Sequence, residues 1–593
     1  MPFGRPLTGS APDRTAPISP APSQGSPPAP VPHPPVSPAP GRDTLRRPDR
    51  LSPALARSAL AAIGALAAVI YAWGITVRPV HNYYASAVRS MAGSWRAFLF
   101  GGFDPQGSIS IDKIPGAFWV QALSVRAFGF HDWSVALPSV LEAVLTILVL
   151  YKVVKRWAGE AAGLLAALVM ALTPIAAALA KSQISDTLLT LLLVLAAGAW
   201  QRSVLDDKPL WPCAVWIGLA FHVKMVQAWL VLPVFAIGYL LFAQRRRIWR
   251  LAAAGGVTLA VSSVWVVITL LTPAADRPYI DATADNDPLS MVLGYNAARR
   301  FHGGHGWRDL LSEHTFLQVG WMYPICLLAI VLGLLWTRRR SGFAMWGMWM
   351  AVHFAAFGFG QFRHAYYVVV LAPAAAALTG AGLVLFWRER SRQPWLLPTV
   401  VMVTAGWTLL LPHRSLTAAV AILALLAVLA LLAARTSRSA ALGAVIGLVA
   451  VLITPAAWTL STDSYVARAN AANPSADAKP RKPHLLSKED RELLDFVRRG
   501  SGNARYVLAV DGAGPAATLI SQAGASVLPM GGYSAKTPFP TAEQFRSLIH
   551  TGQLRYVQGK VTKPAKTVPQ ANVDWAAEHC EEVRAHLYDC AGK

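Results

Sequence analysis

Residues 132–151 have the sequence DWSVALPSVLEAVLTILVLY, and the basic residues Lys152, Lys155 and Arg156 follow directly. An apolar helix of about 20 residues crosses the hydrocarbon core of a bilayer. Basic residues beside such a helix are typical of its cytoplasmic end. The stretch therefore predicts a membrane-spanning helix. The same alternation of apolar runs and short basic clusters recurs through residues 54–459, which predicts a membrane domain of many spans.

The composition points the same way. Apolar residues make up 54% of the 593-residue chain and charged residues 14%, against about 45–50% and about 25% in soluble proteins. This excludes an ordinary soluble enzyme and a mainly disordered chain. The net charge of +23 lies in clusters between apolar runs, so we do not expect nucleic acid as a partner.

The apolar runs predict thirteen spans, and so an α-helical polytopic membrane protein. Apolar residues 115–130 are interrupted by Arg126, and we interpret them as an interfacial helix. The predicted spans are 55–77, 132–151, 160–179, 186–202, 210–226, 228–243, 251–271, 315–336, 342–360, 365–386, 395–412, 415–434 and 438–459.

Thirteen spans place every basic cluster on one side of the membrane, which the positive-inside rule makes the cytoplasm. We therefore expect a multi-pass protein of the cell (plasma) membrane. Its N-terminus is then cytoplasmic, and the chain after residue 460 is extracytoplasmic. The clusters lie at 42–50, 152–156, 245–250, 338–340, 388–392 and 435–438.

Three parts lie outside the predicted spans. Residues 1–53 are rich in proline and poor in bulky apolar residues, which predicts a disordered cytoplasmic tail. Residues 460–485 are a predicted linker. Residues 486–593 alternate helix caps, at Ser487 and Thr541, with β-rich runs at 504–510, 526–530 and 554–559, which predicts a small extracytoplasmic α/β domain. Cys580 and Cys590 lie in it, and a disulfide between them suits that compartment.

Scarce polar residues gather on the predicted outer face. Charges near a membrane core are costly and usually functional. A cluster of cations suits an anion such as phosphate, and carboxylates suit a general base or a metal. Headgroup snorkelling by the cations and an aromatic belt of tyrosines are the alternatives. The candidates are Tyr83, Tyr84, Asp104, Asp112 and Lys113 in the first outer loop (78–131), and Lys181, Asp186, Lys224, Arg363 and His364 at span ends.

The first outer loop, HNYYASAVRSM (81–91) and FDPQGSISIDKIP (103–115), resembles that of glycosyltransferase family 39-like proteins of the GT-C class. The bacterial branch described as mannosyl or aminoarabinose transferases is the closer match. Its further motifs correspond here to Gly218–Ala228, Gly294–Asn296 and Met530–Tyr533. The resemblance covers about residues 60–560.

This resemblance implies an enzyme that transfers a sugar from a polyprenyl-phosphate-linked donor to an extracytoplasmic acceptor, a cell-envelope glycan, lipid or protein. The donor phosphate would lie at the outer membrane surface, among membrane lipid. An acidic residue of the first loop would activate the acceptor hydroxyl. Displacement by that route inverts the anomeric centre. The outer domain would present or select the acceptor.

The sequence departs from the family pattern where relatives carry the catalytic base. Relatives carry an acidic pair before the Tyr-Ala stretch, where this chain has Val80, His81 and Asn82. Asp104 then becomes the candidate base, and Asn82 a candidate substrate contact. The resemblance further implies that the lipid phosphate lies near Lys113 and that Arg363 and His364 bind phosphate. It leaves open whether Asp112 also binds a divalent metal.

Two other functions remain open. A transporter or flippase for lipid-linked sugars expects a polar site near the midplane of the bilayer, and charge is sparse within the spans. A non-catalytic scaffold that binds cell-wall polymer would explain the missing acidic pair.

Overall fold

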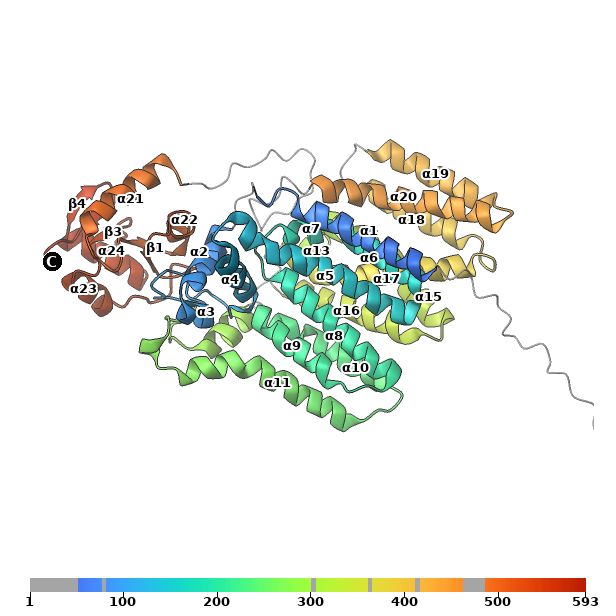
Figure 1. Ribbon diagram of the computed structural model, residues 1–593, viewed down its shortest axis with the longest axis horizontal. Helices are drawn as coiled ribbons and strands as arrows, with labels where there is room; N and C mark the ends of the chain where they lie inside the picture. Colours follow the sequence, from blue (N-terminus) through green and yellow to red (C-terminus); the bar gives the residue numbers. More distant parts are fainter. Residues whose placement is uncertain (1–51, 77–80, 300–305, 361–364, 411–415, 462–485) are drawn as a thin grey trace, which may run out of the picture. The chain divides into compact units, whose positions relative to one another are not determined.

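The computed structural model describes residues 52–76, 81–299, 306–360, 365–410, 416–461 and 486–593. Apolar helices of different lengths make up most of residues 53–461, and the longer ones lie side by side (Figure 1). They are α1 (Pro53–Ala72), α5 (Asp132–Ala158), α6 (Glu160–Ala171), α7 (Pro174–Ala180), α8 (Asp186–Asp206), α9 (Trp211–Lys224), η1 (Met225–Val231), α10 (Leu232–Phe242), α11 (Ile248–Leu271), α15 (Tyr323–Trp336), α16 (Arg340–Phe359), η5 (Ala365–Leu371), α17 (Ala372–Glu389), α18 (Leu396–Leu410), α19 (Thr417–Leu432) and α20 (Ser437–Ser461).

In the described part of the chain, fewer helices than predicted are long and apolar enough to cross a membrane. Among the described residues, 8 helices are long and apolar enough to span, or 9 if α6 and α7 form one span bent by 61°. The bend follows from Pro174, because a proline disfavours helical geometry at the residue before it. The helices Gly320–Trp336, Leu396–Leu410 and Thr417–Leu432 are apolar but shorter. The count of thirteen is therefore not confirmed.

The stretch Trp211–Phe242, one candidate span by composition, reverses direction at Lys224. Lys224 forms an ion pair with Asp186, the first residue of α8. Gln244, beyond α10, donates a hydrogen bond of 3.0 Å to Leu205 O near the other end of α8. The chain thus runs along α8 and returns, with its break at Met225, where φ is 47°. Both predicted spans, 210–226 and 228–243, follow this path.

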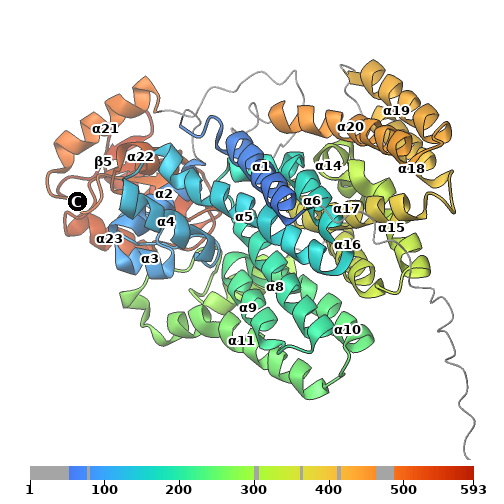
Figure 2. The same ribbon diagram turned by 45° about the vertical axis from the view of Figure 1, so that its right-hand side comes forward.

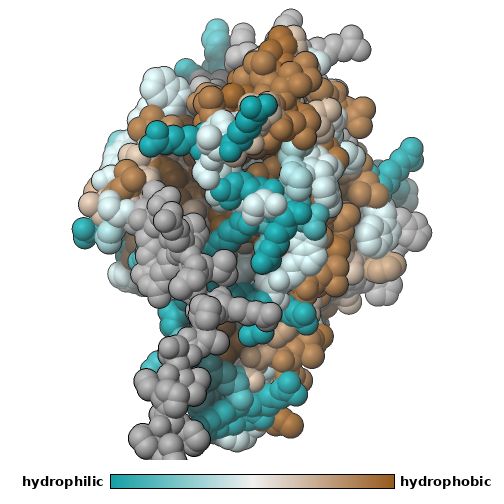
Figure 3. Space-filling model, turned by 90° about the vertical axis from the view of Figure 1, so that its right-hand side faces the viewer, coloured by the Kyte–Doolittle hydropathy of each residue, from teal (hydrophilic) through white to brown (hydrophobic). Residues whose placement is uncertain are grey.

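Basic clusters meet at the far end of α8. Arg156 pairs with Asp206, Arg250 Nη1 lies 2.6 Å from Asp207 Oδ1, and Arg339 Nη1 donates to Trp157 O at 2.8 Å. Figure 3 looks onto this end, where hydrophilic side chains gather beside broad hydrophobic surfaces. A helix of 21 residues is about 30 Å long, so these clusters lie one bilayer thickness from Asp186. We call them the basic end, and the opposite end the site end.

Short helices and loops cover the site end. The first loop forms α2, α3 and α4, and residues 115–130, predicted as interfacial, become α4 packed on α2 and α5. A second loop after α11 pairs with the first through the bridge Ile109–Tyr279. The elements are α2 (Asn82–Gly93), α3 (Trp95–Phe100), α4 (Gly116–Phe128), η2 (Ala274–Asp276), η3 (Ser290–Ala298), α13 (Trp307–Leu310), α14 (Glu313–Gln318) and η4 (Gly320–Met322).

Residues 486–593 contain a five-stranded sheet in the order β2-β1-β3-β5-β4. β1 pairs in parallel with β2 and β3, and β5 is antiparallel to β3 and β4. The capping boxes predicted at Ser487 and Thr541 are present. The elements are α21 (Lys488–Ser501), β1 (Leu508–Asp511), α22 (Ala513–Ala523), β2 (Val527–Met530), α23 (Ala542–His550), β3 (Tyr556–Gln558), α24 (Val568–His579), β4 (Glu581–Arg584) and β5 (Leu587–Asp589). We call residues 486–593 the sheet region; its separation as an independent domain stays a prediction.

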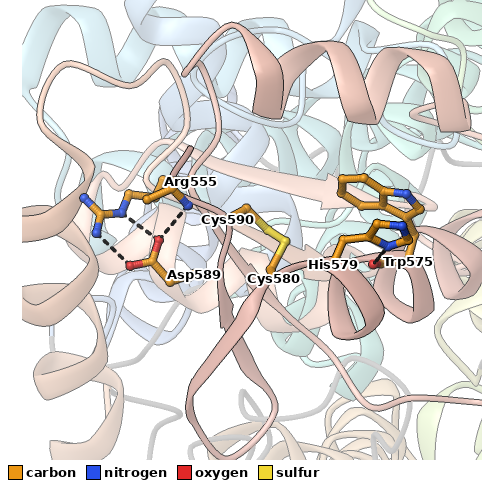
Figure 4. Close-up of a disulfide and its surroundings, with 7 residues drawn as sticks. Arg555, Trp575, His579, Cys580, Asp589 and Cys590 are labelled. Atoms are coloured by element: carbon orange, nitrogen blue, oxygen red, sulfur yellow. Dashed lines mark hydrogen bonds and ion pairs between the residues drawn. A yellow bond between two sulfur atoms is a disulfide. The ribbon is translucent and has the colours of Figure 1, made fainter. Parts of the chain in front are cut away.

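A disulfide joins Cys580, after α24, to Cys590, after β5 (Figure 4). Beside it, Arg555 donates two hydrogen bonds, of 2.8 and 2.7 Å, to the carboxylate of Asp589. The disulfide thus ties the end of β5 to the end of α24, and the Arg555–Asp589 pair ties β5 to the start of β3.

Candidate functional site

Four predicted residues of the first loop lie together. Lys113 Nζ donates a hydrogen bond of 2.7 Å to Tyr84 Oη and lies 3.2 Å from Asp112 Oδ1. The backbone N–H of Asp112 donates to Tyr83 Oη at 3.3 Å. Tyr83 and Tyr84 come from the first turn of α2, so that turn and the Asp112–Lys113 pair form one cluster.

A second charged pair comes from the helices. Asp186, the first residue of α8, pairs with Lys224, the last residue of α9. The Lys224 ammonium also lies 4.9 Å and 4.2 Å from the ring centroids of Tyr366 and Tyr367. Aromatic faces attract a cation, so two rings and one carboxylate hold this lysine at the site end.

A pocket opens beside Lys224 and reaches the first-loop cluster through Asn296. Lys224, Gln227, Asn296, Phe357 and Tyr367 are among the residues that line it. Asn296 Nδ2 donates a hydrogen bond of 2.9 Å to Asp112 O, and so the pocket wall touches the first-loop cluster. Lys224 and Gln227 belong to the motif segment 218–228, and Asn296 to the segment 294–296. Two motifs of the predicted resemblance therefore meet in one pocket.

Lys113 is positively charged near pH 7, because its surroundings raise its pKa. Burial lowers the pKa of Lys113, but Asp112 and Tyr84 raise it by more, so it lies well above its usual range. Burial, and next the Lys113 charge, lower the pKa of His81 to about 4. His81 is therefore neutral near pH 7, while burial raises the pKa of Tyr84 to about 12.

Asp104, the predicted base, has its carboxylate turned into its own loop. It is 0% exposed and accepts hydrogen bonds from the backbone N–H groups of Gln106, Ser108 and Ile109, at 3.1, 2.9 and 3.2 Å, and from Ser108 Oγ at 2.7 Å. Burial raises its pKa, although the bonds from Ser108 and Ile109 act against this. This geometry favours a loop-holding role, and base catalysis by Asp104 stays a prediction.

Asn82 and Lys181 belong to two segments that a hydrogen bond between His81 and Gln183 joins, and their side chains have different surroundings. Asn82 Nδ2 donates to Thr518 Oγ1 of α22 at 3.0 Å, so its side chain faces the sheet region. Lys181 is buried at the C-cap of α7. Gln183, in the same connection, accepts a hydrogen bond of 2.7 Å from the backbone N–H of His81. Arg363 and His364 lie outside the described residues.

Whether Asp112 holds a metal ion was left open by the sequence, and the described part of the chain shows no ligand set for one. That part contains no group of three or more His, Cys, Asp or Glu residues that could hold a metal ion. Asp112 instead pairs with the Lys113 ammonium, at 3.2 Å. These residues do not fit a metal centre, and we derive no step through one.

The sequence prediction missed Asp281. This buried carboxylate lies in the second loop, and burial, with a smaller contribution from Asp112, raises its pKa to about 6. The available signal was the acidic stretch that follows α11, with Asp276, Asp281, Asp285 and Asp287.

Comparison with known proteins agrees with this architecture. Residues 112–270 match the family described as dolichyl-phosphate-mannose-protein mannosyltransferase, and residues 493–579 match the family "Putative mannosyltransferase YkcB-like, C-terminal". The chain is 27% identical to "Putative mannosyltransferase YycA" of Bacillus subtilis (strain 168), over 80% of this chain and 87% of that protein. "Putative mannosyltransferase YkcB" of the same organism is 26% identical, over 80% and 85%.

Solved structures share the fold. ArnT from Cupriavidus metallidurans superposes with a TM-score of 0.53 in the apo state, at 16% identity, covering 85% of this chain and 93% of ArnT. The structure of ArnT bound to undecaprenyl phosphate gives a TM-score of 0.52, at 16% identity, covering 84% and 93%. The protein is thus a multi-pass membrane protein with this fold. The predicted resemblance to GT-C membrane glycosyltransferases of the mannosyltransferase-like group is confirmed.

Proposed function

We propose that the protein transfers a sugar from a polyprenyl-phosphate-linked donor to an extracytoplasmic acceptor, with inversion at the anomeric carbon. The convergence of two motif segments in the pocket between Lys224 and Asn296, against the Asp112–Lys113 pair, carries this proposal. ArnT, which has the same fold, is known bound to undecaprenyl phosphate.

The charges of the site suit a sugar phosphodiester. Lys224 and Lys113 are the cations that bind the phosphate oxygens, because charge-assisted bonds to phosphate are strong. They stabilise the negative charge that grows on the phosphate as the glycosidic bond breaks. Tyr84, which binds Lys113, keeps that cation in place.

Asp112 is the carboxylate best placed to activate the acceptor. In the proposed step its carboxylate takes the proton of the acceptor hydroxyl. The acceptor oxygen then forms a bond to the anomeric carbon while the bond to the phosphate oxygen breaks, and polyprenyl phosphate leaves. A positioned base contributes roughly 10²–10⁴-fold to such a reaction. Asp104 holds the loop that carries Asp112.

The test uses the full chain in proteoliposomes with undecaprenyl-phosphate-[¹⁴C]mannose as donor probe. Detergent-extracted cell envelope of the source cells serves as acceptor. We expect Asp112→Asn to lower incorporation at least 100-fold, and Asp285→Asn, on the exposed second loop, to leave it unchanged. Full activity of Asp112→Asn would overturn its role. Movement of the labelled lipid across the bilayer without sugar transfer would support a flippase instead.

A further inference from the structure

Asp281 binds a turn of the sheet region that is far away in sequence. Its Oδ2 accepts a hydrogen bond of 2.8 Å from the Tyr533 N–H, and its Oδ1 accepts one of 2.6 Å from Thr537 Oγ1. The Ala282 N–H also donates to Oδ1, at 2.6 Å. A buried carboxylate from the second loop thus holds the turn 531–537 at Tyr533 and at Thr537.

The turn is shaped to receive this carboxylate. Gly532 has φ +63°, a conformation that side chains rarely adopt, and a β-carbon there would overlap Asp281 Oδ1. Behind Asp281, its own N–H donates to Ser110 Oγ of the first loop at 3.1 Å. Asp281 therefore connects the turn to the same loop that carries Asp112 and Lys113.

The turn places Tyr533 at the site. The Tyr533 and Tyr83 rings meet edge to face, with centroids 4.9 Å apart. Tyr83 is buried and its hydroxyl accepts the N–H of Asp112, whereas Tyr533 is 48% exposed. Tyr533 therefore presents an exposed aromatic ring, and only the Tyr83 ring separates it from the Asp112–Lys113 pair.

Separate contacts hold the rest of the sheet region on α2. Ser86 Oγ donates to Ala517 O at 2.7 Å, and Arg89 Nη1 to Ser521 O at 2.8 Å, so α22 lies beside α2 (Figure 2). Because these contacts do not involve the turn, loss of Asp281 should free Tyr533 without releasing the whole region.

The two sides of the site suit different substrates. The pocket at Lys224 is lined by the apolar helical residues Leu230, Ala356 and Phe357, and so it suits a lipid phosphate. Tyr533 belongs to the sheet region, in whose described residues no helix is long and apolar enough to span a membrane. The exposed ring of Tyr533 is thus a side from which an acceptor can approach the Asp112–Lys113 pair without passing through the pocket at Lys224.

We propose that Tyr533 forms the acceptor side of the site and that Asp281 is the positioning residue that holds it there. This inference rests on the proposed function. Tyrosine supplies an apolar ring face together with a hydroxyl, which suits a sugar ring or another hydroxyl-bearing group of the acceptor.

The experiment compares Asp281→Asn, Tyr533→Ala and Tyr533→Phe with Asp285→Asn, in the full chain. Amide hydrogen exchange at Tyr533 reports the turn, and binding of undecaprenyl phosphate reports the donor side. Incorporation from undecaprenyl-phosphate-[¹⁴C]mannose is measured while the amount of envelope acceptor is varied. We expect Asp281→Asn to speed exchange at Tyr533 at least tenfold and to raise the half-saturating amount of acceptor at least fivefold. Donor binding should stay within twofold.

Tyr533→Ala should raise the half-saturating amount of acceptor in the same way, whereas Tyr533→Phe, which keeps the ring and the backbone N–H, should retain most of the affinity. Equal losses of donor and acceptor affinity in Asp281→Asn, or unchanged acceptor affinity despite faster exchange, would overturn the inference. If the unaltered protein transfers no sugar, the proposed function fails. Unchanged exchange at Tyr533 in Asp281→Asn would then refute the positioning role independently.

Discussion

The ammonium of Lys224 and the carboxylate of Asp186 form an ion pair between the last residue of α9 and the first residue of α8. Asp186 is fully buried. Removing one partner of a buried pair leaves the other charge without compensation, at a cost of about 3–5 kcal/mol. The pair therefore combines a structural role with the proposed phosphate contact, and the two can be separated.

Lys224→Met should lower both thermal stability and affinity for undecaprenyl phosphate. The loss of one charge-assisted hydrogen bond, about 1.5–3 kcal/mol, corresponds to a Kd about 10- to 150-fold higher. The double variant Lys224→Met with Asp186→Asn should recover much of the stability, because no buried charge is left, but none of the affinity. Recovery of both properties would show that Lys224 acts only through the fold.

Lys113→Ala should weaken binding of undecaprenyl phosphate by about tenfold, since one cation close to the phosphate is lost. The half-saturating amount of acceptor should change less, because Lys113 faces Tyr84 and Asp112 rather than Tyr533. Equilibrium binding and acceptor titration measure the two effects. Lys208→Ala, an exposed lysine near the basic end, is the matched control. Unchanged donor affinity in Lys113→Ala would contradict its proposed role.

Asp281 should give stability a distinctive pH dependence. Its pKa is raised to about 6 against an unfolded value of about 3.9. The folded protein therefore binds the extra proton between these values, and the contribution of Asp281 to stability falls as pH rises through about 6. The groups that face it are Asp112, Tyr83 and Tyr279.

The measurement compares melting temperatures of the unaltered protein and Asp281→Asn at pH 4.5 and pH 7.5. We expect the unaltered protein to gain about 2 kcal/mol relative to the variant on going from pH 7.5 to pH 4.5. A constant difference between the two proteins at both pH values would show that Asp281 ionises normally in the fold.

Membrane orientation can be tested by labelling from one side. Arg246→Cys lies at the basic end, and Thr551→Cys on an exposed turn of the sheet region. If the basic end is cytoplasmic, as its charge predicts, an impermeant maleimide should label Thr551→Cys in intact cells and Arg246→Cys only after permeabilisation. The opposite pattern would invert the predicted topology.

The sequence predicted the helical membrane part, and it singled out several residues that the structure brings together, because both depend on local signals. Apolar length marked the helices, and short motifs marked Asp112, Lys113 and Lys224. Asp104 shows the limit of such signals, because the sequence does not reveal that its carboxylate accepts hydrogen bonds from Ser108 and Ile109 of its own loop. Asp281 was missed because its partners Tyr533 and Thr537 lie more than 250 positions away.

The helix α2 carries Tyr83 and Tyr84 in its first turn and binds α22 through Asn82, Ser86 and Arg89. One helix of 12 residues thereby links the two tyrosines that contact Asp112 and Lys113 to the C-terminal sheet. A truncated protein ending near residue 485 would leave these polar groups facing solvent and the two tyrosines without their brace. The proposed site and the C-terminal sheet must therefore be inherited, exchanged or engineered together.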